Sequence, residues 1–166
     1  MSSLKILHYE RIYETQLIAL IAKNRIALAE LKKREKLLDL DVAREELNYF
    51  INKNFPIFIA INENQDLIGF TVCRVDENIV WDELLFVIPE ERRKGIGSAL
   101  FKRAEEFAIE MGGHTLYNWV LPNNYRSIPF LKKHGYRVLN LIEVRKRLPN
   151  ETLTQKIKIG KFEYDY

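Results

Sequence analysis

The stretch VIPEERRKGIGSAL, residues 87–100, decides the fold of this chain. It predicts a strand that stops at Pro89, then a basic turn, then a helix. Gly95 and Gly97 let backbone N–H groups approach an anion without obstruction by a Cβ atom. The positive end of the following helix dipole points at the same place. The stretch therefore predicts a turn that binds a phosphate.

The spacing of this turn excludes two other phosphate-binding loops. A P-loop needs a lysine directly after its second glycine, but Ser98 follows Gly97 in this chain. A dinucleotide-binding turn needs a third glycine three residues after the second, and Leu100 stands there. The pattern that remains is Arg92-x-x-Gly95-x-Gly97.

A second segment, NYRSIPFLKKHGY at residues 124–136, predicts a short helix. Asn124 suits the N-cap, and Gly135 suits the position just past the C-terminus. Lys132 and Lys133 suit the negative end of the helix dipole. The sequence between the two segments has room for one helix and one strand.

Together the two segments resemble the signatures of the Gcn5-related N-acetyltransferase (GNAT) superfamily, over roughly residues 55–147. The first resembles its coenzyme A pyrophosphate loop, and the second resembles its helix that opens with an asparagine. The resemblance implies an α/β fold with a mixed, mostly antiparallel twisted sheet and helices on both faces. Its splayed central strand pair, ending at Val87 and starting near Thr115, would hold the pantetheine arm.

The resemblance also implies transfer of an acetyl group from acetyl-CoA to a primary amine of a small molecule or peptide. The backbone N–H of Val87 is the expected donor to the thioester carbonyl. The strand residues expected to pair with pantetheine are Phe86, Val87 and Ile88, and Asn124 and Ser127 are expected on the cofactor arm. The residues expected at the pyrophosphate are Arg92, Arg93, Lys94, Gly95, Ile96, Gly97 and Ser98.

Glu83 is the predicted general base, as in family members that place a glutamate on this strand. It lies four residues before Val87, so strict alternation would put both side chains on the same face as Leu85. Asp82 has the opposite parity and is the weaker candidate. The competing interpretation makes Glu83 a surface carboxylate or an ion-pair partner.

One position departs from the family pattern and leaves the general acid open. Leu131 stands where family members carry a tyrosine, seven residues after the asparagine. Tyr125 and Tyr136 are the candidate substitutes, each with a structural interpretation beside it. This departure motivates an alternative function, a non-catalytic coenzyme-A-binding regulatory or interaction module. The acceptor itself is not specified by the sequence.

The bulk properties indicate one globular domain over residues 1–166. The chain is 47% hydrophobic and 30% charged, with a net charge of +3, which gives little reason to expect nucleic-acid binding. It has no apolar run of membrane-spanning length and no signal peptide pattern. The single cysteine, Cys73, fits a reducing, cytoplasmic setting, and its apolar strand predicts that it lies in the core. The three histidines have no metal-ligand spacing, so no metal is expected.

Hydrophobic periodicity predicts the remaining elements. The expected strands are residues 4–9, 55–61, 67–75, 79–88, 114–121 and 136–147, and the expected helices are 11–35, one capped by Asp41, 96–111 and one opened by Asn124. Trp81, Tyr117 and Trp119 read as core or groove-lining aromatics. The tail, residues 152–166, alternates apolar and charged residues and could add a strand to a sheet edge, with a homodimer left open.

Overall fold

The computed structural model describes residues 4–166, which divide into two compact units, residues 4–119 and 120–166. Each unit is described by itself. The elements of the first are β1 (Lys5–His8), η1 (Arg11–Tyr13), α1 (Glu14–Leu31), α2 (Leu40–Asn52), β2 (Ile57–Ile61), β3 (Leu67–Asp76), β4 (Ile79–Val87), η2 (Pro89–Glu91), α3 (Ile96–Glu110) and β5 (Leu116–Asn118). Those of the second are α4 (Ser127–Lys133), β6 (Lys156–Ile159) and β7 (Phe162–Asp165).

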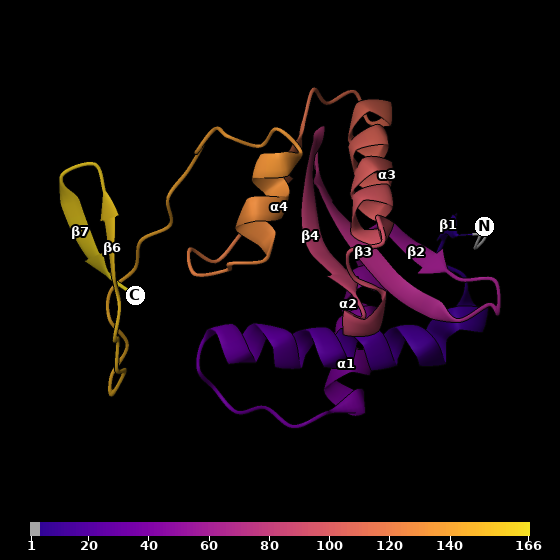
Figure 1. Ribbon diagram of the computed structural model, residues 1–166, viewed down its shortest axis with the longest axis horizontal. Helices are drawn as coiled ribbons and strands as arrows, with labels where there is room; N and C mark the ends of the chain where they lie inside the picture. The colour runs from indigo at the N-terminus through magenta and orange to yellow at the C-terminus, as the bar shows by residue number, and fades with distance from the viewer. Residues whose placement is uncertain (1–3) are drawn as a thin grey trace. The chain divides into compact units, whose positions relative to one another are not determined.

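The first unit is a five-stranded sheet in the order β1-β2-β3-β4-β5 (Figure 1). Its first three pairings are antiparallel, and β4 pairs with β5 in parallel. Strand β5 accompanies β4 only over the register Val80–Leu116 to Asp82–Asn118, while β4 continues to Val87. The mixed, mostly antiparallel sheet with a splayed strand pair was predicted correctly.

Helices cover both faces of this sheet. The side chains of Ile57, Ile59 and Phe70 belong to the core that α1 and α2 form with one face. On the other face Phe58 packs against Phe107 of α3, with ring centroids 5.9 Å apart. Strand β2 is buried along its whole length, which explains its continuous apolar sequence.

Two predicted helix starts need correction. Asp39, not Asp41, caps α2, because its side chain accepts a hydrogen bond from Val42 N at 3.0 Å. The helix α4 begins at Ser127 rather than at Asn124. Asn124 Oδ1 nevertheless accepts from Ser127 N at 2.9 Å, so it stabilises the turn that leads into the helix. Gly135 takes the predicted left-handed conformation after α4, with φ at +89°.

The predicted strand over residues 136–147 is wrong as a description of the second unit. Residues 136–148 are in no regular element, and Val138 and Leu141 are 90% and 79% exposed. A strand requires a ladder partner for its N–H and C=O groups, and the second unit as described supplies none to this segment. The tail is ordered, as predicted, but β6 and β7 pair with each other in a separate two-stranded sheet.

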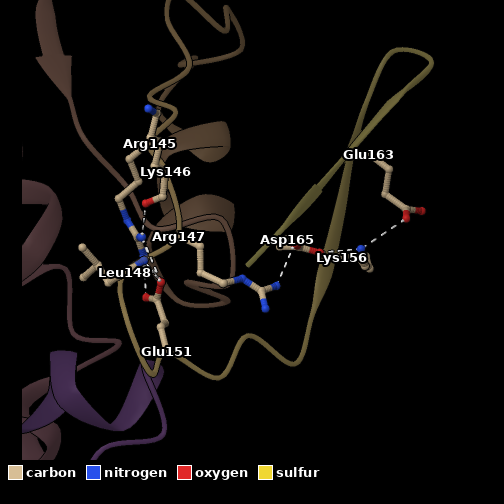
Figure 2. A network of polar contacts seen from close by, with 8 residues as sticks. All are labelled: Arg145, Lys146, Arg147, Leu148, Glu151, Lys156, Glu163 and Asp165. Carbon is tan, nitrogen blue, oxygen red and sulfur yellow. Dashed lines mark hydrogen bonds and ion pairs between the residues drawn. The ribbon is translucent and has the colours of Figure 1, made fainter.

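Charged contacts hold the second unit around this hairpin (Figure 2). Arg147 pairs with Asp165 at 2.9 Å, and Lys156 also contacts that carboxylate. Arg145 donates from both terminal nitrogens to Glu151, at 2.9 and 2.6 Å. These contacts join Arg145 and Arg147, at the end of the segment that has no regular structure, to residues that follow it in the chain.

Candidate active site

The end of β4 presents backbone groups toward the edge where β5 diverges. Ile88 N donates to Ile68 O of β3 at 3.0 Å, so the main-chain groups of Ile88 and Phe86 point toward β3. These directions alternate along a strand, so the N–H and C=O groups of Leu85 and Val87 point the other way. The Val87 N–H therefore points away from β3, toward the edge where β5 diverges. The structure turns Phe86 and Ile88, two predicted pantetheine partners, toward β3 instead.

The basic turn then reverses the chain into α3. Pro89 to Glu91 form a single 3-10 turn, and Arg93 and Gly95 are left-handed with φ of +67° and +86°. A Cβ at Gly95 would meet no atom within 4 Å, so glycine is needed there for its backbone angle, and the space above it is open. Helix α3 begins at the next residue, Ile96, and its first-turn amides carry the positive end of the dipole.

Two of the three cations of the turn make intramolecular contacts. Arg92 Nε donates to Val87 O at 2.8 Å, which ties the turn to the end of β4. Lys94 Nζ pairs with Glu91 at 2.9 Å. The three basic residues directly precede the left-handed Gly95 in the sequence, and their positive charge adds to that of the N-terminal amides of α3.

A β-bulge in β4 changes which side chains share a face. Val72 pairs with Leu84, and the next residue of β3, Cys73, pairs with Asp82. Glu83 is therefore the extra residue of the bulge. Since paired residues share a face and neighbours alternate, Leu84 and Asp82 lie on opposite faces of the sheet. The alternation assumed in the sequence prediction does not hold across Glu83.

The bulge places Asp82, rather than Glu83, on the face of Leu85 and Val87. Thr71 is paired with Leu85, and its Oγ1 donates to Asp82 Oδ1 at 2.8 Å. Asp82 is buried, and burial raises its pKa from 3.8 to about 7, against the Thr71 hydrogen bond, which lowers it. The parity argument for Glu83 is thus wrong, although its assignment as base is not decided by this.

Glu83 turns toward the face covered by α1 and α2. Its Oε2 lies 3.1 Å from Nε of Arg74, whose guanidinium stands 4.2 Å from the ring centroid of Trp81. The ring centroid of Trp119, just after β5, lies 4.3 Å from the same guanidinium carbon, and Trp119 is 66% exposed. Trp119 is therefore not a core residue. The sequence analysis missed Arg74, although an arginine in an otherwise apolar strand was a signal.

The remaining predicted residues lie in the second unit or in the core. Asn124, Ser127 and Tyr125 belong to residues 120–166, where Asn124 contacts Ser127 and Tyr125 is 67% exposed beside Arg126. Cys73 is buried, as predicted, and burial raises the pKa of its thiol. In residues 4–166 no three His, Cys, Asp or Glu side chains gather as a metal site. No helix in that range is long and apolar enough to cross a bilayer.

Comparison with known proteins gives a consistent family. A model described as acetyltransferase (GNAT) family matches residues 25–136. An uncharacterised N-acetyltransferase of Methanocaldococcus jannaschii is 28% identical over 108 residues, which are 61% of this chain and 48% of that protein. The N-acetyltransferase YjcF of Bacillus subtilis, also uncharacterised, is 27% identical over 121 residues, 66% of this chain and 84% of the relative. This chain thus matches just under half the length of the Methanocaldococcus protein.

Solved structures agree in fold. A GNAT-family acetyltransferase from Staphylococcus aureus Mu50 has a TM-score of 0.64 at 23% identity, covering 80% of this chain and 84% of that one. The aminoglycoside acetyltransferase AAC(6')-Iy, bound to a CoA-containing bisubstrate analogue, has a TM-score of 0.69 at 16% identity, covering 88% and 99%. These likenesses confirm the predicted fold class, and the names of the relatives match the predicted class of enzyme.

Proposed function

Because this chain belongs to the acetyltransferase (GNAT) family, we propose that it transfers the acetyl group of acetyl-CoA to a primary amine of a small molecule or peptide. One observation carries the proposal. Within the first unit, the open edge of β4 at Val87 is tied by Arg92 to a left-handed glycine turn at the N-terminus of α3. A strand edge that leads into an anion-binding turn suits an extended chain ending in a diphosphate.

The turn fits a pyrophosphate on physical grounds. Gly95 is left-handed with open space above it, so phosphate oxygens can approach the backbone there. The amides of Ile96, Gly97 and Ser98 in the first turn of α3 would supply donors, and Arg93 and Lys94 would add positive charge. Asn124 and Ser127 are proposed to contact the cofactor arm.

Val87 is proposed to polarise the reacting carbonyl. Acetyl-CoA supplies the acetyl group as a thioester. The Val87 N–H points to the open strand edge and would donate to the oxygen on which negative charge develops. Arg92 supports this role, because its bond to Val87 O fixes the plane of the next peptide and the end of the strand.

Glu83 is proposed to remove the amine proton. An alkylamine with a pKa of about 10.4 is neutral in roughly one molecule in 2,500 at pH 7, so a base matters. Glu83 lies four positions before Val87, a span of roughly 13 Å at about 3.3 Å for each step, so the proton would leave through bridging water. The nitrogen–carbon bond forms as the carbon–sulfur bond breaks, and the thiolate leaves.

Asp82 is the second candidate base. Its pKa of about 7 suits a general base at neutral pH, and it shares a face with Val87. Its burial argues against contact with an acceptor. Tyr125 is proposed as the acid that protonates the thiolate, although a thiolate leaves readily without one.

The acceptor panel should begin with amino sugars. Two aminoglycoside N-acetyltransferases share this fold: AAC(6')-Iy at 16% identity, and AAC(6')-Ih, which is from Acinetobacter baumannii, at 18% identity. Polyamines and peptides with free α- or ε-amines complete the panel. We also propose a reducing cytoplasm as the setting, from the single buried thiol of Cys73.

The test is turnover of the purified chain with acetyl-CoA across this panel. Thiol release and a mass gain of one acetyl group on an acceptor are expected. Glu83→Gln should lower kcat for alkylamines by about 10²- to 10⁴-fold, whereas Glu63→Gln, at an exposed turn, should have no effect. Absence of turnover with acetyl-CoA binding intact would support the alternative, a non-catalytic coenzyme-A-binding module. That alternative is motivated by Leu131, which stands where family members carry a tyrosine.

A further inference from the structure

Arg74 lies beside two indole rings near the end of β3, close to the turn into β4. It faces Trp81 directly across the β3–β4 ladder, with the guanidinium carbon 4.2 Å from that ring. Trp119 covers the group at 4.3 Å, and the two tryptophan rings are 6.5 Å apart. The two rings are tilted by 55°, so the guanidinium makes cation–π contacts on two sides, which restrict its position. This arrangement of Arg74, Trp81 and Trp119 is called the clamp below.

The clamp directs Arg74 at the bulge residue. Nε of Arg74 lies 3.1 Å from Glu83 Oε2. Nε and Nη2 of Arg74 are both buried and have no hydrogen-bond partner among the described residues, so the contact with Glu83 is an ion pair and the unpaired donors cost stability. An arrangement that accepts an unpaired buried donor while fixing a carboxylate favours a role in function over a role in stability.

We propose that Arg74 is a positioning residue for Glu83, and this inference rests on the proposed function. The bulge frees Glu83 from the alternation of β4, so the backbone alone does not fix where its carboxylate points. Arg74, locked by Trp81 and Trp119, fixes the carboxylate and supplies its counter-charge. Arg74 does not itself contact the reacting atoms; it acts through Glu83.

The chain offers a matched control in Arg103. Its side chain is 24% exposed against 23% for Arg74, and it stands 4.5 Å over the ring of Phe58. It also pairs with a carboxylate, Glu110, at 2.9 Å, but through α3 on the other face of the sheet. Arg103→Met therefore removes an arginine with an ion pair and an aromatic contact, as Arg74→Met does, but it leaves the contact with Glu83 in place.

The experiment measures kcat and KM for the native chain, Arg74→Met, Glu83→Gln, the double variant and Arg103→Met. Arg74→Met should lower kcat by about tenfold or more and leave the KM for acetyl-CoA within about twofold. Arg74→Lys should restore part of the loss. In the Glu83→Gln background, Arg74→Met should change kcat by less than about twofold. Arg103→Met should leave kcat unchanged.

Urea denaturation of the same proteins separates this inference from the proposed function. The stability losses of Arg74→Met and Glu83→Gln should be less than additive in the double variant, whether or not the chain turns over. Additive losses, multiplicative effects on kcat, or equal kcat losses in Arg74→Met and Arg103→Met would each overturn the positioning role. Lack of turnover by the native chain would instead refute the proposed function.

Discussion

Replacement of Asp82 by asparagine should raise the free energy of unfolding above that of the native chain, and by more at pH 7 than at pH 4. Asp82 is buried between β3 and α3 and accepts one hydrogen bond, from Thr71. Burial raises its pKa from 3.8 to about 7, and the nearby charge of Glu83 adds to the increase. Asparagine has the same shape, keeps the acceptor for Thr71 and carries no charge.

The sign follows from proton binding. Between pH 4 and pH 7 the folded state holds a proton on Asp82 that the unfolded state has released, so native stability falls as pH rises through this range. A change from 3.8 to about 7 is about three pH units, which corresponds to about 4 kcal/mol at 1.36 kcal/mol for each unit. The free energy of unfolding of Asp82→Asn minus that of the native chain should therefore increase by about this amount between pH 4 and pH 7. Above pH 7 the difference should stay constant.

Urea denaturation at pH 4, 5.5, 7 and 8 measures this difference, since other titrating groups cancel between the two proteins. Asp76→Asn, at the exposed end of β3, is the control and should show no pH-dependent difference of this kind. A flat difference between Asp82→Asn and the native chain would refute the reasoning. It would mean that the Asp82 carboxylate is already ionised in the fold at pH 5.

Further substitutions test the turn, the sheet and the core. Gly95→Ala should cost roughly 1–2 kcal/mol of stability because of its left-handed angle, and it should weaken coenzyme A binding about tenfold in calorimetry. The control Gly112→Ala, also at φ +86°, should cost the same stability and leave binding unchanged. Equal affinities of the two variants for coenzyme A would exclude the turn as the phosphate site. Gly69→Ala should lose about 1–3 kcal/mol in denaturation, because its Cβ would lie 2.9 Å from Phe86 O; an unchanged midpoint would contradict this packing. Cys73 should resist an aromatic disulfide reagent until the chain unfolds, and rapid labelling at neutral pH would show that it is not buried.

Local sequence was enough wherever neighbours in the chain make the structure. Gly95 and Gly97 predicted the basic turn, and in the structure Gly95 takes a left-handed angle that few other residues adopt at no cost. Pro89 predicted the end of β4, and Gly135 the end of α4. Asn124 predicted a helix start, and the helix begins three residues later, at Ser127, after a turn that Asn124 stabilises. Together these signals predicted the family and its fold.

Pairing between strands decided the rest. The bulge at Glu83 exists because β3 and β4 slip by one residue between Val72 and Cys73, and no residue of β4 alone indicates that slip. Alternation therefore assigned Glu83 and Asp82 to the wrong faces. The clamp on Arg74 likewise joins β3, β4 and the end of β5.

The sequence by itself determined the order of elements as far as α4, the basic turn and the class of ligand, because glycine angles, capping side chains and local charge act over a few neighbouring residues. Tertiary structure alone decided which carboxylate faces which side of β4, and it left residues 136–148 without regular structure. A strand's face and its existence depend on the register and presence of a partner, which lies far away in the chain.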